Sequence, residues 1–302
     1  MNPYLRAIRL ERWPRSLAIF LGPAAYVFLF RQALAGLTVL EAAWRLALSF
    51  LLTWGISTAN YIVNEIADMP TDIHHPTKKH RPLIKGEVKK RPFALLGFAL
   101  AALCLSAAWL AFTPPFFYSL LALLAAGFIY NIKPLRTKDI PFLDSLSESM
   151  NNPIRLFVGW FAFAPAHLFP PLSLVLCWWA FGNLLMVAKR LSEFRFLKEK
   201  AEEYRVSHRA YTRTSLLLGM AASAVIFIAT YFWFAASFRL QSFYLYSVPI
   251  LLLMSIVFRK TLREEEVMEE PEKLFGTPLV AGVLIVLLAL FSLSFFLDHV
   301  GR

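Results

Sequence analysis

Long apolar stretches separated by shorter polar segments dominate this sequence. Nine of the apolar stretches approach or exceed the length needed to cross a bilayer, since an α-helix crosses the hydrocarbon core in about 20 residues. They cover residues 16–36, 43–67, 92–112, 115–132, 145–165, 171–189, 214–236, 242–259 and 277–297. The pattern therefore predicts an all-α fold, an integral membrane bundle of about nine transmembrane helices in a single domain over residues 1–302.

The polar segments differ in length and charge. Nine crossings place the N-terminus and four long loops on one side of the membrane, namely residues 68–91, 133–144, 190–213 and 260–276. With the bordering Lys189 and Arg259, that side holds 26 of the 31 Lys and Arg residues. Because basic loops remain on the cytoplasmic side, we expect a protein of the cell (inner) membrane whose active-site cavity opens to the cytoplasm.

The composition agrees with a lipid environment. Apolar residues make up 58% of the chain and charged residues 17%, proportions that are unusual for a soluble domain. The net charge of +11 raises nucleic-acid binding as an alternative, but the basic residues are spread over membrane-proximal loops, so we expect the bilayer and no nucleic acid as a partner. Cys104 and Cys177 lie in apolar runs without the spacing of a zinc or redox site.

The end of the second apolar stretch holds the strongest candidate chemistry. Asn64, Asp68 and Asp72 are spaced four residues apart, with Glu65 beside them. This spacing places them on one face of a helix end. Oxygen ligands with open positions suit Mg²⁺, which is often bound by one or two carboxylates together with substrate phosphates. The pattern predicts a Mg²⁺ site formed by these four residues.

The residues around this site predict a place for phosphate. Asn60 lies one turn further into the apolar run, where its amide needs a partner. We expect Pro70 to end the helix, so that Asp72 turns back toward the cavity. The basic loop that follows supplies Lys78 and Arg81, and a guanidinium is well suited to binding phosphate. Lipid headgroups and topology alone would explain such a basic loop equally well.

A second polar stripe lies within residues 130–160. Asp144, Glu148, Asn151 and Arg155 follow at steps of four, three and four, so they share one helix face. Ionisable residues inside a membrane are functional candidates because their burial is costly. The alternative is structural, with one of the two acids pairing with Arg155 to hold two helices together. Polar residues at the end of the preceding helix extend the candidate site: Tyr130, Lys133 and Lys138.

A third polar stripe follows Asn183. Arg190 and Glu193 share a face with it, and Lys189 lies next to them. Membrane helices often end in Lys-Arg, and Glu193 is also placed to form a simple ion pair with Arg190. Three stripes that reach the same side of the membrane nevertheless favour three walls of one cavity. A transporter is the alternative from another class, but its binding site would lie near the midplane.

The first of these stripes resembles the UbiA superfamily of intramembrane transferases. Asn64, Glu65, Asp68 and Asp72 match its first signature, N(D/E)xxDxxxD. The nine predicted helices agree as well, so the resemblance covers nearly the whole chain. It implies an all-helical bundle with a lateral, lipid-accessible cavity and a Mg²⁺-dependent loss of diphosphate from a donor.

The third stripe departs from the common pattern of that superfamily. Most members transfer prenyl groups to aromatic or lipid acceptors and carry a second aspartate-rich signature after the sixth helix, where this chain reads KRLSE. That segment, HPTKKHRP after the first signature, and Asp144 followed by Arg155 resemble the decaprenyl-phosphate phosphoribosyltransferase branch. This resemblance implies transfer of phosphoribose from phosphoribosyl diphosphate to a polyprenyl phosphate.

Two reactions remain open at this point. In the first, the donor is phosphoribosyl diphosphate and the acceptor is a polyprenyl phosphate. In the second, a prenyl diphosphate donates to another lipid-soluble acceptor. In both, Asp68 and Asp72 hold the metal. In the first reaction Lys189 and Arg190 bind phosphate, while Asp144 and Tyr130 are candidates to stabilise positive charge at the anomeric carbon. Further substrate-binding candidates are Asn60, Asn64, Lys78, Arg81, Lys133, Lys138, Glu148, Asn151, Arg155 and Glu193.

Overall fold

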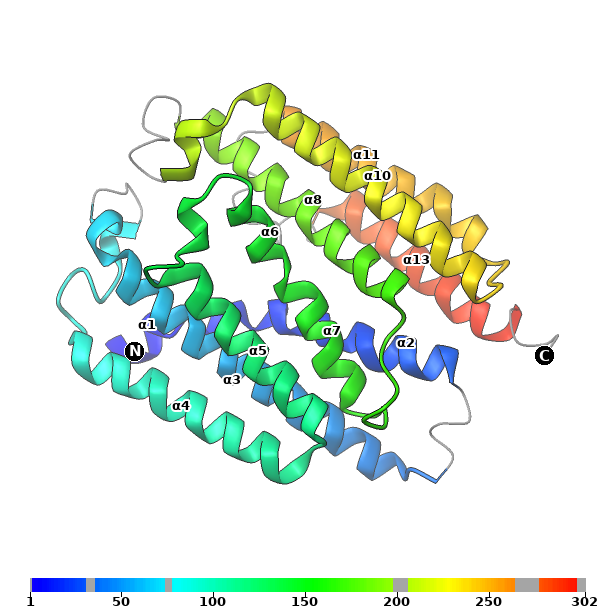
Figure 1. The fold of residues 1–302 in the computed structure, drawn as a ribbon, viewed down its shortest axis with the longest axis horizontal. Helices are drawn as coiled ribbons and strands as arrows, with labels where there is room; N and C mark the ends of the chain where they lie inside the picture. The colour runs from blue at the N-terminus through cyan, green and yellow to red at the C-terminus, as the bar shows by residue number, and fades with distance from the viewer. Residues whose placement is uncertain (1, 31–35, 74–77, 198–205, 264–276, 298–302) are drawn as a thin grey trace. The chain divides into compact units, whose positions relative to one another are not determined.

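The computed structural model of this chain describes residues 2–30, 36–73, 78–197, 206–263 and 277–297 (Figure 1). Helices and the turns between them make up the described residues, and no strand occurs among them. The chain divides into two compact units, Met1–Pro170 and Pro171–Arg302. The expected single domain over residues 1–302 stays a prediction, whereas the all-α class is confirmed.

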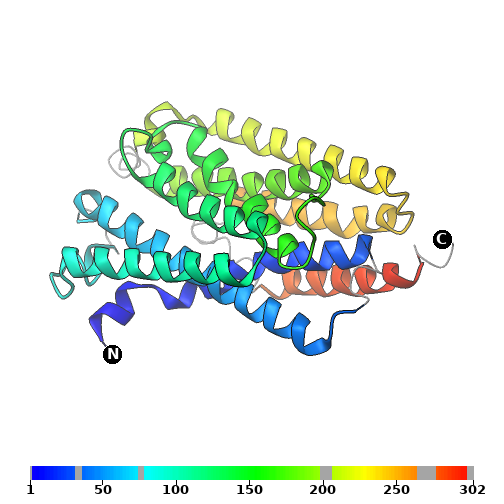
Figure 2. The same cartoon turned by 60° about the horizontal axis from the view of Figure 1, so that its bottom comes forward.

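The first unit is built around one long helix. In chain order its elements are α1 (Pro3–Ala7), η1 (Leu10–Phe20), α2 (Leu21–Leu29), α3 (Val39–Asp72), η3 (Lys78–His80), α4 (Lys90–Ala111), α5 (Pro114–Asn131), η4 (Thr137–Asp139), α6 (Leu143–Ser149) and α7 (Asn151–Phe161). Helices α4 and α5 both pack against α3, and α7 contacts α5, α2, η1 and α3. Both views of the fold show α4 alongside α3 (Figures 1 and 2).

Helix α3 is longer than its apolar pattern predicts. It begins with a capping box, in which the Thr38 hydroxyl accepts from the Glu41 backbone N–H at 3.2 Å and the Glu41 carboxylate accepts from the Thr38 N–H at 2.8 Å. These bonds satisfy backbone donors that a helix start otherwise leaves unpaired. The helix therefore starts four residues before the expected position 43 and carries the polar stripe as far as Asp72.

Two of the expected membrane segments are divided in the structure. Residues 16–36 were expected to form one spanning helix, but 3₁₀-helix η1 ends at Phe20 and α2 ends at Leu29. Residues 145–165 form α6 and α7, which are separated at Met150. Pro153 explains this second break, because it has no N–H to donate to the carbonyl of Ser149 four residues earlier.

The described part of the second unit contains four helices and a short 3₁₀ turn. They are α8 (Leu172–Leu197), η6 (Val206–Ala210), α10 (Arg213–Ser237), α11 (Phe243–Arg263) and α13 (Pro278–Leu297). Helix α8 packs along α10 and also contacts α11, and α11 packs against α13. Asn183 of α8 donates to the Ser223 hydroxyl of α10 at 2.9 Å. Such a bond between two apolar helices satisfies polar groups that lipid cannot.

Six described helices are long and apolar enough to cross a membrane. They are Val39–Asp72, Lys90–Ala111, Pro114–Asn131, Leu172–Arg195, Arg213–Ser237 and Phe243–Arg263, and Pro278–Ser294 is a shorter apolar helix. The expected total of nine crossings stays a prediction, because the two divided segments and Pro278–Ser294 fall below this length. The chain is an integral membrane protein.

Replacing Gly22 with alanine is expected to destabilise the first unit. An added Cβ at Gly22 would overlap backbone atoms of Leu156, Gly159 and Trp160 in α7, and backbone cannot move aside as a flexible side chain can. Overpacking of this kind costs about 1–3 kcal/mol. Thermal unfolding in detergent should show the lower midpoint. Gly282→Ala is the matched control, because its Cβ meets no atom within 4 Å; an equal loss in both variants would contradict the prediction.

Candidate active site

The polar stripe predicted at the end of the second apolar stretch lies on the last turns of α3. The helix continues through Pro70 to Asp72, so the expectation that Pro70 ends it is wrong. The physical reason is that Pro70 stands in the last turn and removes only one backbone hydrogen bond there. Asp68 and Asp72 consequently remain on one helix face.

Asp68 is held by two basic side chains from the segment after α5. Lys138 Nζ contacts Asp68 Oδ1 and donates to Asn131 Oδ1 at 2.8 Å. Arg136 Nη2 donates to Asp68 Oδ1 at 3.4 Å, and Arg136 also pairs with Asp139. Lys138 is only 5% exposed, and its ammonium lies 5.9 Å from the centre of the Tyr130 ring. A buried ammonium needs compensating partners, so Asp68 and Lys138 depend on each other.

Asp72 is held in the same way by the loop that follows α3. Arg81 Nη1 forms an ion pair with Asp72 Oδ2, and Lys78 Nζ lies 4.0 Å from Asp72 Oδ1. Asp72 is buried, with 3% of its surface exposed. The first four residues of the expected basic loop, 74–77, lie outside the described residues. Each of the two signature aspartates therefore meets two cationic side chains.

This donor set fits Mg²⁺ only together with phosphate. No group of three His, Cys, Asp or Glu side chains able to hold a metal occurs in the part of the chain that the structure describes. Asp68 and Asp72 supply hard oxygen atoms, but cations surround both. Bare Mg²⁺ would be repelled by these cations, whereas a Mg²⁺-diphosphate complex brings negative charge and further oxygen ligands.

Glu65 faces a different neighbour from the aspartates. Its Oε2 lies 3.3 Å from Arg9 Nε, in the turn before η1, and its Oε1 is buried without a hydrogen-bond partner. Burial lowers the pKa of Arg9, repulsion from Arg81 acts in the same direction, and Glu65 opposes both. Glu65 thus ties the N-terminal segment to α3, and its role as a metal ligand stays a prediction.

The two asparagines of the stripe have different surroundings. Asn60 Nδ2 donates to the backbone carbonyl of Leu123 in α5 at 2.8 Å, while its Oδ1 is buried without a partner. A Cβ on Gly127 would overlap the Asn60 amide, so α5 approaches α3 closely at this point. Asn64 is partly buried and lies one turn before Asp68. Asn60 therefore joins two helices, and substrate binding by either residue stays a prediction.

The second predicted stripe surrounds the end of α5. The Tyr130 hydroxyl donates to Glu148 Oε2 at 3.1 Å, which joins α5 to α6. The Asn151 side chain donates to the Glu148 backbone carbonyl at 3.0 Å. Asp144 is fully buried, and its Oδ1 accepts from the Ser145 N–H at 2.7 Å. Lys133, in contrast, is exposed. Tyr130 and Glu148 thus adjoin Lys138 and its partner Asp68.

Arg155 does not pair with the acids on its own stripe. Its Nη2 donates to the Ser57 hydroxyl of α3 at 3.4 Å, and none of the ion pairs among the described residues joins it to Asp144 or Glu148. The helical repeat places all three on one face, but the break at Met150 separates them into two helices. The structural alternative of an ion pair along this stripe is wrong.

The third stripe forms a buried cluster within the second unit. Arg190 is fully buried, and its Nη1 donates to Glu193 Oε2 at 3.0 Å. The same carboxylate oxygen lies 3.3 Å from His208 Nε2 in η6. His208 Nδ1 is buried without a hydrogen-bond partner, and Lys189 is partly buried. The expected Arg190–Glu193 pair exists, but in a buried setting and with a histidine as a third member.

Four residues of these clusters were not predicted from the sequence: Arg9, Arg136, His208 and Asn131. Arg9 lies in an N-terminal segment whose charge is explained by topology, and Arg136 and His208 lie in loops without helical periodicity. Asn131 was missed as well, although it ends α5 directly after the candidate Tyr130. A usable signal existed only for Arg136, since the segment 133–139 contains three basic residues.

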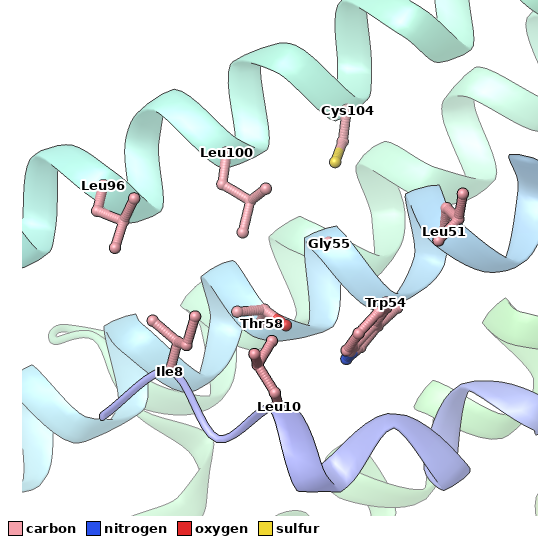
Figure 3. Close-up of a pocket in the computed structure, with 9 residues that line it drawn as sticks. All are labelled: Ile8, Leu10, Leu51, Trp54, Gly55, Thr58, Leu96, Leu100 and Cys104. Carbon is pink, nitrogen blue, oxygen red and sulfur yellow. The ribbon is translucent and has the colours of Figure 1, made fainter. Parts of the chain in front are cut away.

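An apolar pocket of about 300 Å³ lies away from these polar clusters. It is formed by the N-terminal segment, α3 and α4, and Figure 3 shows Leu10, Trp54 and Leu100 turned toward it. Its residues on α3 are Leu51, Trp54, Gly55 and Thr58, and none of the residues that line it is charged. The Trp54 indole N–H is buried without a partner there. The pocket thus contributes no charged group to the candidate site.

Comparison with known proteins gives consistent similarities in sequence. A model of the UbiA prenyltransferase family matches residues 20–276. The decaprenyl-phosphate phosphoribosyltransferase of Mycobacterium tuberculosis is 26% identical over 233 residues, which cover 75% of this chain and 72% of that protein. A protein of the same name from Corynebacterium glutamicum is 26% identical over 230 residues, which cover 74% and 64%.

Solved structures show a similar fold. A UbiA homologue from Archaeoglobus fulgidus bound to GPP and Mg²⁺ has a TM-score of 0.61 at 19% identity, covering 97% of this chain and 98% of that chain. The apo structure of a UbiA homologue from Aeropyrum pernix K1 has a TM-score of 0.59 at 20% identity, covering 89% and 97%. At these identities the likeness concerns the fold.

Proposed function

Because the chain belongs to the UbiA prenyltransferase family, and is thus an integral membrane transferase, we propose that it transfers 5-phosphoribose from phosphoribosyl diphosphate to a polyprenyl phosphate. The Arg190–Glu193–His208 cluster carries this proposal. The cluster occupies the position at which most members of the superfamily are expected to carry a second aspartate pair. This part of the chain therefore offers a buried guanidinium in place of metal-binding carboxylates. The curated relatives at 26% identity bear the name of this reaction. Membership in a transferase family removes the transporter alternative.

The cations around Asp68 and Asp72 would hold the leaving group. Lys138, Arg136, Arg81 and Lys78 all lie against the two aspartates. In the reaction, the bond between the ribose anomeric carbon and the diphosphate oxygen breaks, and the diphosphate takes the electron pair. The cations stabilise the negative charge that develops there. Mg²⁺, bound by Asp68 and Asp72 with Asn64 nearby, would supply further neutralisation of that charge.

The acceptor needs little activation. A polyprenyl phosphate is already anionic, so its oxygen forms the new bond to the anomeric carbon without a strong general base. The Tyr130 hydroxyl donates to Glu148, and the Tyr130 ring lies 5.9 Å from the Lys138 ammonium. We propose that this pair and Asp144 stabilise the positive character of the anomeric carbon. The basic loops further suggest a site that opens to the cytoplasmic side of the inner membrane.

The second candidate function is prenyl transfer from a polyprenyl diphosphate. It is favoured by the family description and by the fold neighbour bound to GPP and Mg²⁺. A prenyl diphosphate brings one anionic group, which the cations around Asp68 and Asp72 could hold. It would leave the buried Arg190 without a phosphate to bind, and for this reason we place it second.

Purified protein in detergent is expected to incorporate label from phosphoribosyl diphosphate into a polyprenyl phosphate when Mg²⁺ is added. The parallel reaction uses a labelled prenyl diphosphate with the same acceptor and with a lipid-soluble aromatic acceptor. Extraction into organic solvent and thin-layer chromatography separate the products. The Asp68→Asn variant controls for label carried over without turnover. Incorporation from the prenyl donor alone would overturn the proposal.

A further inference from the structure

Arg155 is a partly buried cation without a carboxylate partner among the described residues. Its one hydrogen bond there is to the Ser57 hydroxyl at 3.4 Å, which is near the long limit for such a bond, and its buried Nε has no partner. A buried charge is costly when no opposite charge compensates it. The protein thus retains a guanidinium that a neutral side chain would replace at lower cost if it served only to join α7 to α3.

Two neighbours of Arg155 act on its charge in opposite directions. Tyr61 of α3 favours the charge, whereas Arg15 of η1 opposes it. The three elements that carry these residues, η1, α3 and α7, pack against one another in the first unit. The Arg155 guanidinium and the Ser57 hydroxyl therefore meet where no carboxylate compensates the charge of Arg155 among the described residues. This arrangement is typical of a site for a phosphate group.

The position along α3 relates this site to the signature aspartates. Ser57, Tyr61, Asn64 and Asp68 follow at steps of four, three and four, so they lie on one face of α3. At 1.5 Å per residue, Ser57 lies about 10 Å from Asn64 and about 16 Å from Asp68 along the axis. The two sites are thus separate but aligned on the same face.

We propose that Arg155, with Ser57, forms a second anion site that binds a phosphate monoester during the transfer reaction. The inference rests on the proposed function, in which two substrates carry such a group: the donor has its 5-phosphate, and the acceptor has its terminal phosphate. A prenyl diphosphate carries no phosphate monoester group besides its diphosphate. This site therefore selects phosphoribosyl transfer, whereas the cations around Asp68 and Asp72 suit either donor.

Steady-state kinetics of Arg155→Met tests the site. Loss of charged hydrogen bonds to a phosphate is expected to raise the KM of the substrate that uses the site by about 10-fold or more, with a smaller change in kcat. If the donor's 5-phosphate binds there, inhibition by ribose 5-phosphate weakens by a similar factor. If the acceptor's phosphate binds there, the KM of the polyprenyl phosphate rises and that inhibition is unchanged. Arg155→Lys, which keeps the charge, should fall between wild type and Arg155→Met.

Arg45→Met is the matched control. Arg45 of α3 also bridges to the segment after α7, donating to the Ala162 carbonyl at 3.2 Å, and its Nε is likewise buried without a partner. It lies twelve residues before Ser57 and should leave both KM values unchanged. Thermal unfolding gives a second readout: without ligand, Arg155→Met should be at least as stable as wild type, because it removes an uncompensated charge.

The outcomes separate this inference from the proposed function. Phosphoribosyl transfer by the wild type with both KM values unchanged in Arg155→Met overturns the second anion site alone, as does a loss of stability in that variant with unchanged KM values. Transfer from a prenyl diphosphate, with none from phosphoribosyl diphosphate, overturns the proposed function and this site with it. If Arg155→Met does not fold, Arg155→Lys provides the same comparison, and a KM equal to wild type for both substrates counts against the site.

Discussion

Replacing Asp68 with asparagine is expected to lower turnover by about 100-fold or more while the protein keeps its fold. Asp68 is the point where the candidate metal site meets the cations that would hold diphosphate, since Lys138 and Arg136 both contact its Oδ1. Asparagine preserves the shape but removes the negative charge, so it weakens the metal and releases the two cations together. Initial rates over a Mg²⁺ titration measure the effect.

A loss of turnover in Asp68→Asn has to be distinguished from a loss of protein stability. Asp68→Asn leaves the ammonium of Lys138 buried without its carboxylate, which lowers stability. The double variant Asp68→Asn/Lys138→Met restores the charge balance and should unfold close to wild type, yet it should remain inactive. Glu87→Gln is the control for losing an acid from an ion pair, because Glu87 pairs with Arg6 in an exposed position. Near-normal turnover of Asp68→Asn at saturating Mg²⁺ would show that the metal assignment is wrong.

Helical periodicity predicted the features of the site that lie on continuous helices. The spacing of Asn64, Asp68 and Asp72 was sufficient to place them on one face of α3, and the family match confirms the resemblance that rests on them. The apolar pattern placed the end of α3 at 67, however, because Pro70 and the charged residues around it resemble a helix end. Side chains that cap or pair these charges come from other elements, and one sequence does not reveal them.

The partners of the signature aspartates could not be derived in this way. Arg136 and Lys138 reach Asp68 across about seventy residues of chain, and their segment has no periodicity to fix its direction. Arg136 itself adopts a positive φ of 21°, a conformation that sequence patterns do not anticipate for arginine. Likewise, the ion pair between Arg9 and Glu65 joins the N-terminal segment to α3, a contact set by packing and not by spacing.

The break within residues 145–165, in contrast, was predictable from the sequence. Pro153 was visible in the sequence, and its missing N–H could have predicted the division at Met150. Treating the stripe from Asp144 to Arg155 as one helix face led to the wrong pairing alternative for Arg155. In the two helices, Glu148 meets Tyr130 at the end of α5, whereas Arg155 meets Ser57 of α3, which gives the two halves of the stripe different roles.

Replacing Lys138 with methionine is expected to change metal binding and donor binding in opposite directions. The Lys138 ammonium is buried against Asp68 Oδ1 and Asn131 Oδ1, so it occupies oxygen that a metal ion would use. Without it, Mn²⁺ alone should bind about 10-fold more tightly. The donor, in contrast, loses a cation for its diphosphate, and its KM should rise by about 10-fold or more.

Electron paramagnetic resonance of free Mn²⁺ measures the first effect on purified protein without any donor, and steady-state kinetics measures the second. Lys90→Met removes an exposed lysine at the start of α4 and should change neither quantity. Metal affinity that is unchanged or weaker in Lys138→Met would contradict the prediction. It would mean that the ammonium supports the carboxylate in its metal-binding position instead of competing for it.

If the loss of Lys138 strengthens metal binding and weakens donor binding, then metal and donor are coupled in the wild type. When metal binds at Asp68, Lys138 has to leave that oxygen, and its ammonium becomes available to the diphosphate of the donor. Each ligand then favours the other, and by linkage the gain is the same whichever binds first. Diphosphate should therefore raise the affinity for Mn²⁺ by a larger factor in the wild type than in Lys138→Met. Equal factors in the two proteins would show that metal and diphosphate bind without this exchange.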